Sequence, residues 1–155
     1  MEVISNFAEN LKFRMKPDFK IIPKKDILIV APLIQKLSNH SVAASILKER
    51  LHEMTEQNYE CIGIYDEGTL IGCCGIWFMT RHYAGKSCEA DHVYIDDTYR
   101  SKGIGKQLFE WLEAYVKTKG CEAIELNAYI HNEAGHRFYE REGFAKPGYH
   151  FLKRF

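Results

Sequence analysis

Apolar and polar residues follow a strand-like pattern in some segments of this chain and a helical pattern in others. The change of pattern predicts its secondary-structure elements. Runs rich in β-branched and aromatic residues, typical of strands, fill residues 59–79 and 86–95. Residues 66–68, "DEG", interrupt the first run and predict a hairpin turn. From residue 104 the apolar residues recur every three to four positions, which predicts a long amphipathic helix that ends at Gly120. Its apolar face collects Ile104, Leu108, Trp111, Leu112, Tyr115 and Val116.

The remaining segments complete one α/β domain, without repeats or a linker. Strands are predicted at residues 18–22 and 121–130, and helices at 23–38, 39–56 and 132–143. Pro32 should kink or split the first helix, and Ser41 is a candidate N-cap of the second. The last twelve residues, 144–155, are expected to form one or two short strands. For residues 1–17 the pattern leaves a short helix and an ordered tail as alternatives.

Charge and composition narrow the possible classes of function. Lysine plus arginine equals aspartate plus glutamate at 21 each, so we expect no general attraction to nucleic acid or to a membrane surface. No apolar run approaches a membrane span, and the N-terminus does not resemble a signal peptide. The five cysteines show no metal-binding spacing and are expected to be buried and free. These features predict a cytoplasmic protein.

A basic turn precedes the long helix and carries the clearest chemistry. In "YRSKGIGKQL", Gly103 and Gly105 lie among three basic residues at the start of a helix, where free N–H groups favour a bound anion. A Rossmann site requires a third glycine at position 108, which is leucine, and a Walker loop requires a pattern that is absent. The turn therefore predicts a phosphate site outside both common nucleotide folds, although a plain surface turn is the alternative.

Two motifs together resemble the GNAT superfamily of N-acetyltransferases. "YRSKGIG" is similar to its R/Q-x-x-G-x-G/A signature, and "NEAGHRFYEREGF" is similar to its second motif, with glycine in place of alanine at 135. The resemblance covers about residues 19–155, which leaves 1–18 as an N-terminal extension. It implies an α/β (α+β) domain with a mixed, mostly antiparallel sheet, splayed central strands and about four flanking helices. The anion would be the pyrophosphate of acetyl-CoA, the co-substrate.

The resemblance also implies which residues bind acetyl-CoA. The strand residues Val93, Tyr94 and Ile95 would offer free backbone groups to the pantetheine arm. The turn would hold the pyrophosphate, mostly through main-chain N–H groups, and comprises Arg100, Ser101, Lys102, Gly103, Ile104, Gly105 and Lys106. Asn132 and Tyr139 of the second motif are added to this site. They are seven residues apart, which places both on one face of a helix, and Asn132 is also the expected N-cap.

Acid–base catalysis has one candidate acid and several candidate bases. Tyr139 is protonated at neutral pH and can protonate a leaving thiolate, the role that the resemblance implies. An amine must lose a proton before it attacks, and Glu89, Asp91 and His92 lie on the strand nearest the expected thioester. Strand alternation would place Glu89 and Asp91 on one face and His92 on the other. Glu89 or His92, acting through water, is the predicted base.

The resulting hypothesis is direct transfer of an acetyl group from acetyl-CoA to a primary amine in a ternary complex. A small molecule is the expected acceptor, and the closing residues are similar to those of aminoalkylphosphonate N-acetyltransferases. The alternatives are a protein or peptide N-acetyltransferase and a non-catalytic acyl-CoA-binding regulatory domain. No metal is expected, because His131, His136 and His150 lack metal-ligand spacing. The resemblance also suggests a homodimer.

Overall fold

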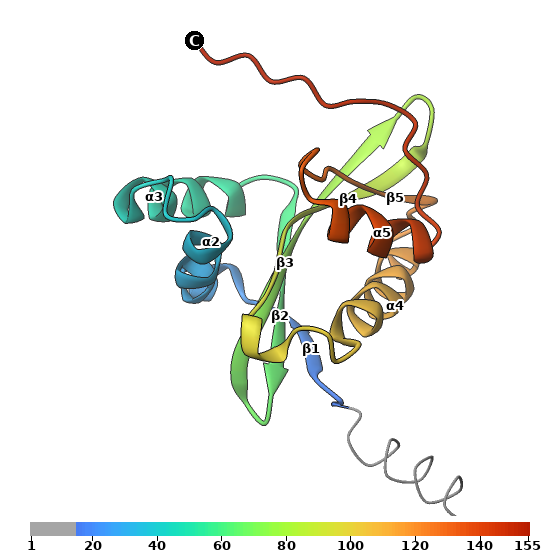
Figure 1. The fold of residues 1–155 in the computed structure, drawn as a ribbon. Coiled ribbons are helices and arrows are strands. Elements are labelled where there is room, and N and C mark those ends of the chain that lie inside the picture. Colours follow the sequence, from blue (N-terminus) through green and yellow to red (C-terminus); the bar gives the residue numbers. More distant parts are fainter. Residues whose placement is uncertain (1–14) are drawn as a thin grey trace, which may run out of the picture.

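A five-stranded sheet in the order β1-β2-β3-β4-β5 lies between two layers of helices (Figure 1). The computed structural model describes residues 15–155; the predictions for residues 1–14, most of the expected extension, lie outside them. The first four strands pair antiparallel in sequence order, whereas β4 and β5 pair parallel. The strands are β1 (Asp18–Ile21), β2 (Tyr59–Asp66), β3 (Thr69–Arg81), β4 (Gly85–Ile95) and β5 (Ala123–Leu126).

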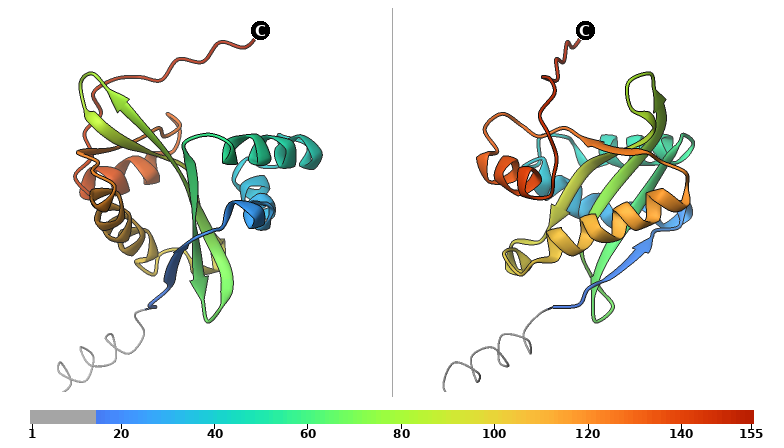
Figure 2. Two further views of the ribbon diagram at one scale, coloured as in Figure 1. Left: turned by 180° about the vertical axis from the view of Figure 1, so that it is seen from behind. Right: turned by 90° about the vertical axis from the view of Figure 1, so that its right-hand side faces the viewer.

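Each face of the sheet has its own apolar core. The 3₁₀ helix η1 (Lys24–Val30) with α2 (Ala31–Leu37) and α3 (Ala44–Thr55) covers one face, which we call the α2–α3 face (Figure 2). The other, the α4 face, is covered by α4 (Ile104–Thr118) and α5 (Glu133–Arg141). The stripe of α4 predicted from the sequence packs into this core, where Leu108 and Leu112 are fully buried. The short 3₁₀ helix η2 (Asp97–Tyr99) connects β4 to the turn before α4.

Most predicted elements are confirmed, and three details of the prediction are wrong. Pro32 does split the first helical segment, since it lies in the first turn of α2. Ser41 is not an N-cap, because α3 begins after Ala43 without a side-chain cap. The strand predicted at 121–130 is confined to β5, and residues 144–155 contain no strand. These last residues form an extended tail that rises away from the domain (Figures 1 and 2).

A β-bulge in β4 changes which side chains share a face. Gly75 of β3 pairs with Asp91, but Cys73 pairs with Tyr94, so two residues of β4 oppose one residue of β3. His92 lies in this bulge and has a positive φ of 32°. The extra residue reverses the alternation, and Asp91 and His92 both face the α2–α3 side, where they bond to Trp77 and Tyr59. The prediction that they lie on opposite faces is therefore wrong.

The cysteines behave as the composition predicts. All five are buried and free, and four of them belong to β2, β3 or β4. Within residues 15–155, no three histidine, cysteine or acidic side chains gather closely enough to hold a metal ion. No helix in that range has the length and apolar character needed to cross a membrane.

Candidate active site

The parallel pairing of β4 with β5 ends halfway along β4 and opens a gap in the sheet. Ala90 pairs with Leu126, the last residue of β5, after which the chain leaves the sheet. Within the described part of the chain, residues 91–95 of β4 consequently have no strand on this side, although they still pair with β3 around the bulge. Val93, Tyr94 and Ile95, the predicted pantetheine-binding residues, lie in this unpaired stretch, which matches the predicted splaying of central strands.

The turn between η2 and α4 presents free backbone N–H groups. Gly103 is the N-cap of α4 with a left-handed backbone (φ 76°), and no side chain caps the helix. The first helical bond is donated by Gln107, so the N–H groups of Ile104, Gly105 and Lys106 have no partner inside the helix. No acidic residue lies in the first turn. Such a helix start suits a negatively charged group.

The basic side chains of the turn are only partly available to an anion. Arg100 donates from Nε to the carbonyl of Ile95 at 2.9 Å and pairs with Asp97 at 2.7 Å, so it fixes the turn to the end of β4. Lys102 lies over the ring of Tyr99, and both Lys102 and Lys106 are exposed. Main-chain N–H groups are thus the main anion ligands that the turn offers, with the lysines adding charge.

Helix α5 packs against the start of α4 and brings the second motif to the turn. The side chain of Asn132 caps α5 by accepting from the N–H of Gly135 at 3.0 Å, which confirms the predicted N-cap. A Cβ at residue 135 would lie 2.4 Å from Asn132 Nδ2, so glycine leaves room for the capping side chain. Phe138 lies 3.2 Å from the place where a Cβ of Gly105 would stand, and this contact joins the two helices.

Tyr139 is half-buried on the α4 face between three aromatic rings. Its ring packs edge-on against Phe109 and Phe144, with centroids 5.7 and 5.9 Å away. Burial raises the pKa of Tyr139, and the nearby thiol of Cys74 adds to this. Cys74 is the residue of β3 that faces the bulge of β4, so Tyr139 lies close to the gap between β4 and β5. A phenol in this setting keeps its proton at neutral pH.

His92 lies on the opposite face of the sheet from Tyr139, and its ring extends over β3 toward β2. Its Nε2 lies 2.7 Å from the hydroxyl of Tyr59, a residue only 2% exposed. Its Nδ1 is shielded from water and has no hydrogen-bond partner within residues 15–155. The ring lies over Gly75, where a Cβ would stand 2.0 Å from Nε2, so no other residue leaves it room. Tyr59, the bulge and Gly75 together fix the position of the imidazole.

The surroundings of His92 favour its neutral form. Burial lowers the pKa of His92, while the carboxylate of Asp91 partly opposes this. Asp91 accepts from Trp77 Nε1 at 3.1 Å and from the backbone N–H of His92 at 2.8 Å. Burial raises the pKa of Tyr59 well above its ordinary value, so this phenol keeps its proton. A neutral imidazole can accept a proton at whichever ring nitrogen carries no hydrogen.

Glu89 belongs to a network of polar side chains on β3, β4 and β5. Its two oxygens accept from Arg81 at 3.0 Å and from Asn127 at 2.8 Å. Arg81 also pairs with Glu125, which accepts hydrogen bonds from Tyr83 and Ser87. Burial alone would raise the pKa of Glu125, but the hydrogen bonds from Tyr83, Ser87 and Arg81 outweigh it and lower that pKa. Both oxygens of Glu89 thus accept hydrogen bonds, whereas one ring nitrogen of His92 has no partner within residues 15–155.

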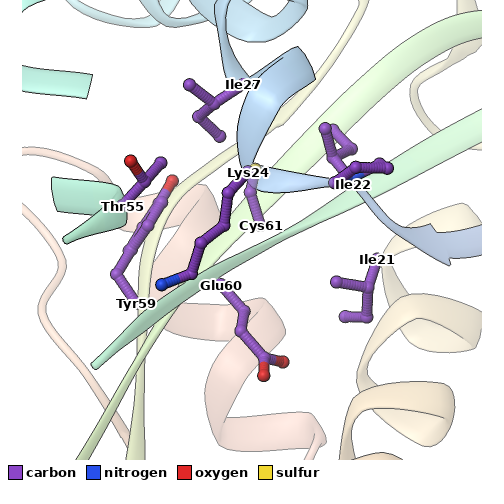
Figure 3. A pocket seen from close by; sticks show the side chains of 9 residues that line it. Ile21, Ile22, Lys24, Ile27, Thr55, Tyr59, Glu60 and Cys61 are labelled. Atoms are coloured by element: carbon purple, nitrogen blue, oxygen red, sulfur yellow. The ribbon is translucent and has the colours of Figure 1, made fainter. Parts of the chain in front are cut away.

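A shallow pocket lies on the α2–α3 side, between η1 and the start of β2 (Figure 3). Its lining is largely apolar, with Lys24, Thr55 and Glu60 at its polar positions. None of the predicted acetyl-CoA-binding residues lines it. Tyr59 is the one residue that joins this pocket to the site, because its hydroxyl bonds to His92.

The sequence names the turn, Tyr139 and His92 as candidate site residues but does not reveal the residues that position His92. The turn is bonded to Ile95 at the end of β4, Tyr139 lies on the α4 face beside Cys74 and His92 lies on the α2–α3 face, whereas Glu89 lies within the β4–β5 pairing. Tyr59 and Gly75 are missed, and Tyr59 carries no signal beyond its place in a predicted strand. Gly75 does carry one, since an isolated glycine within a strand often marks the close approach of another group.

Comparison with known proteins identifies the family model that this chain matches. Residues 32–144 match the Acetyltransferase (GNAT) family. An aminoalkylphosphonate N-acetyltransferase of Salmonella typhimurium is 33% identical over 87 residues, which is 56% of this chain and 56% of that protein. A spermine/spermidine N(1)-acetyltransferase of Bacillus subtilis is 28% identical over 95 residues, 58% of this chain and 62% of the relative. The chain thus spans little more than half the length of these relatives.

Solved structures share the fold over nearly the whole chain. The aminoglycoside N-acetyltransferase AAC(6')-Iy, solved in complex with CoA, superposes with a TM-score of 0.78 at 14% identity, covering 90% of this chain and 95% of its own. A ribosomal-protein-alanine N-acetyltransferase from Brucella melitensis gives a TM-score of 0.75 at 22% identity, covering 90% and 99%. At these identities the likeness concerns the fold alone.

Proposed function

We propose, from the premise that this chain belongs to the Acetyltransferase (GNAT) family, that it transfers an acetyl group from acetyl-CoA to a small primary amine. The observation that carries the proposal is that three features flank residues 91–95 of β4, the stretch beyond its pairing with β5. These are an uncapped helix start for a pyrophosphate, a protonated Tyr139 on one face and a neutral His92 on the other.

Acetyl-CoA would supply the acetyl group, and the residues around the gap fit its parts. The N–H groups of Ile104, Gly105 and Lys106 would hold the pyrophosphate, while Lys102 adds positive charge. On the side of β4 that β5 leaves open, backbone groups of Val93, Tyr94 and Ile95 would bind the pantetheine arm and polarise the carbonyl of the thioester. Asn132 would stabilise the start of α5, the helix that carries Tyr139, through its capping hydrogen bond from Gly135.

His92 is the general base that the geometry favours over Glu89. With a proton on Nε2, donated to the oxygen of Tyr59, the ring leaves a lone pair on Nδ1, the buried atom without a partner. Nδ1 is buried in the free protein, so binding of the acceptor would have to admit the water molecule through which His92 takes a proton from the amine. Asp91 would stabilise the resulting imidazolium. Glu89 would instead help to position the acceptor, because both of its oxygens already accept hydrogen bonds.

Tyr139 would complete the transfer as the general acid. As the new C–N bond forms and the C–S bond breaks, Tyr139 gives its phenol proton to the leaving sulfur. The second proton that the acceptor nitrogen loses on becoming an amide passes through water to the Tyr139 phenolate, and the proton on His92 is released to water. No covalent bond to the protein is needed, so the amine and acetyl-CoA would be bound together.

The acceptor would bind on the α2–α3 face beside β4. This stretch carries three carboxylates and one guanidinium, those of Glu89, Asp91, Glu125 and Arg81. The excess of negative charge would attract an ammonium group. The partial similarity to an aminoalkylphosphonate N-acetyltransferase and to a spermine/spermidine N(1)-acetyltransferase supports a small acceptor. We further propose that the protein acts as a homodimer.

A panel of amines tests this function. Release of CoA thiol is measured with aminoalkylphosphonates, polyamines, glucosamine 6-phosphate and peptides, and calorimetry measures the binding of acetyl-CoA. We expect binding together with thiol release that depends on a small amine. Binding without release for any amine would favour a non-catalytic acyl-CoA-binding domain, and release with peptides alone would favour a protein acceptor.

A further inference from the structure

The segment between β4 and α4 is anchored at its first residue, Asp96. The N–H of Asp96 donates to the carbonyl of Ile71 on β3 at 2.8 Å. Its side-chain oxygen Oδ1 accepts from the N–H of Thr98 at 3.2 Å and from the Thr98 hydroxyl at 2.9 Å, so Asp96 is the N-cap of η2. Asp96 therefore fixes the place where the chain leaves the sheet and enters the turn at residues 100–106.

The second side-chain oxygen of Asp96 bonds to helix α2. Oδ2 accepts from Lys36 Nζ at 3.1 Å, although the two residues are 60 positions apart. Lys36 lies in the last turn of α2, which passes beside β4 (Figure 1). The side chain of Asp96 is only 24% exposed, so the pair is partly shielded from solvent. The hydrogen bond from Lys36, more than those from Thr98, lowers the pKa of Asp96, and Asp96 raises the pKa of Lys36.

This ion pair connects the two sides of the proposed reaction. Helix α2 belongs to the α2–α3 face, where the acceptor would bind, whereas α4 and the turn before it belong to the other face. Among the hydrogen bonds and ion pairs of residues 15–155, the Lys36–Asp96 pair is the one that joins η1, α2 or α3 to residues 96–106. Arg100, in contrast, bonds only locally, to Ile95 and Asp97.

The turn depends on such anchors because its backbone is unfavourable. Ser101 and Gly103 both have left-handed backbones, with φ of 60° and 76°. Glycine adopts this conformation freely, but for serine it is unfavourable, so the surrounding contacts must stabilise it. The N–H groups of Ile104, Gly105 and Lys106 point toward one anion only while the residues before them keep this conformation.

We infer that the Lys36–Asp96 pair positions the turn for the pyrophosphate of acetyl-CoA, so that helix α2 contributes to donor binding from the acceptor side. The inference rests on the proposed function, which assigns the anion at the turn to acetyl-CoA. Both are positioning residues, because they act through the backbone of the turn. Without the pair, fewer molecules hold the turn in its binding conformation, and the apparent dissociation constant rises accordingly. For a partly exposed pair we expect a rise of about two- to fivefold.

Calorimetric titration of the full chain with acetyl-CoA tests the inference. Lys36→Met removes the ammonium group, and Asp96→Asn removes the carboxylate but keeps an oxygen that can cap η2. Each change should weaken binding by about two- to fivefold, and the double variant should bind no more weakly than either single variant. Lys36→Arg keeps the charge and should bind acetyl-CoA as the wild type does.

The direction of the Asp96→Asn effect separates positioning from simple charge attraction. If charge alone decided the affinity, removing a carboxylate close to the turn would strengthen the binding of an anionic ligand. Positioning predicts weaker binding instead. In the thiol-release assay, the KM for acetyl-CoA should rise by the same factor with kcat unchanged, because the pair acts on binding and not on the transfer step.

Lys117→Met is the matched control for Lys36→Met. Lys117 is also a lysine in the last turn of its helix, α4, where it pairs with Glu113. It lies at the opposite end of α4 from the turn, so Lys117→Met should leave the affinity for acetyl-CoA unchanged.

Several outcomes would overturn the inference. These are tighter binding by Asp96→Asn, full affinity in Lys36→Met, additive losses in the double variant, or an equal loss in Lys117→Met. Loss of the folded far-UV circular dichroism in Lys36→Met would also overturn it, because the pair would then be required for the fold. A wild type that does not bind acetyl-CoA would overturn this inference and the proposed function together. If the wild type binds acetyl-CoA but transfers no acetyl group, the proposed function alone fails, since calorimetry still measures the effect of the pair.

Discussion

Replacing Gly75 by alanine should displace the imidazole of His92 and thereby lower both the free energy of unfolding and kcat. The new Cβ would lie 2.0 Å from His92 Nε2 and 2.6 Å from Cε1, far inside contact distance. Overpacking of this kind costs about 1–3 kcal/mol. Loss of the hydrogen bond to Tyr59 leaves a buried phenol unpaired, at about 1–3 kcal/mol more. We expect Gly75→Ala to lower the free energy of unfolding by about 2–6 kcal/mol.

The matched background for this test is His92→Ala, which removes the ring that the new methyl group would meet. In that background Gly75→Ala should change the free energy of unfolding by no more than about 0.5 kcal/mol, the level of non-interacting sites. Urea denaturation gives the coupling free energy between positions 75 and 92. It is measured for the wild type, both single variants and the double variant. The thiol-release assay should show that all three variants lose kcat by about 100-fold, the scale of a missing general base.

Additive effects on stability would refute this reasoning. If Gly75→Ala cost the same with and without the imidazole, the methyl group would be meeting something other than His92. A normal kcat in Gly75→Ala, with the predicted loss of stability, would instead separate the two roles. It would keep His92 as a packing residue and remove it as the base.

Three further predictions concern the turn, the acid and the pH dependence of folding. Tyr139→Phe should lower kcat by about 100-fold or more with little change in the calorimetric affinity for acetyl-CoA, and an unchanged kcat would remove its role as the acid. Ser101 has a left-handed backbone (φ 60°), so Ser101→Gly should raise the free energy of unfolding by up to about 1 kcal/mol in urea denaturation; a loss of stability would contradict this. Because burial lowers the pKa of His92, the unfolded chain binds its proton first as the pH falls below about 6.5. Stability should therefore be full above this pH and fall below it, by at most about 1.4 kcal/mol per pH unit, and His92→Phe should remove this part of the slope in melts from pH 5 to 8.

Local patterns of apolar and polar residues predict those helices and strands that bury one face and expose the other. The stripe on α4 is wide enough to fix both the helix and its buried side, and the hairpin of β2 and β3 follows from two strand-like runs around a short turn. The turn before α4 is predictable for a similar reason, because glycine at 103 is required by a backbone that other residues adopt at a cost.

Features that depend on tertiary contacts escape the sequence pattern. Alternation fails at His92, because a single extra residue in β4 turns the ring toward Tyr59, which lies 33 positions earlier in the chain. The glycine at 135 reads as a departure from the family motif, yet in the structure it makes room for the side chain of Asn132. Residues 144–155 have strand-like composition but pair with no strand within residues 15–155, so composition alone gives the wrong state.

The short parallel pairing of β5 also has a consequence for how the protein folds and opens. Strands β1 to β4 form a chain of antiparallel neighbours, most of them joined by short turns, whereas β5 reaches β4 only after the crossover through α4 and is held over four residue pairs. Contacts of long sequence separation form late, because the chain must first lose the entropy of closing the loop. We therefore expect β5 and α5 to dock last in folding and to exchange their amide hydrogens faster than β3. The half of the protein that carries Tyr139 would then be able to open as a unit while the remainder of the sheet stays folded.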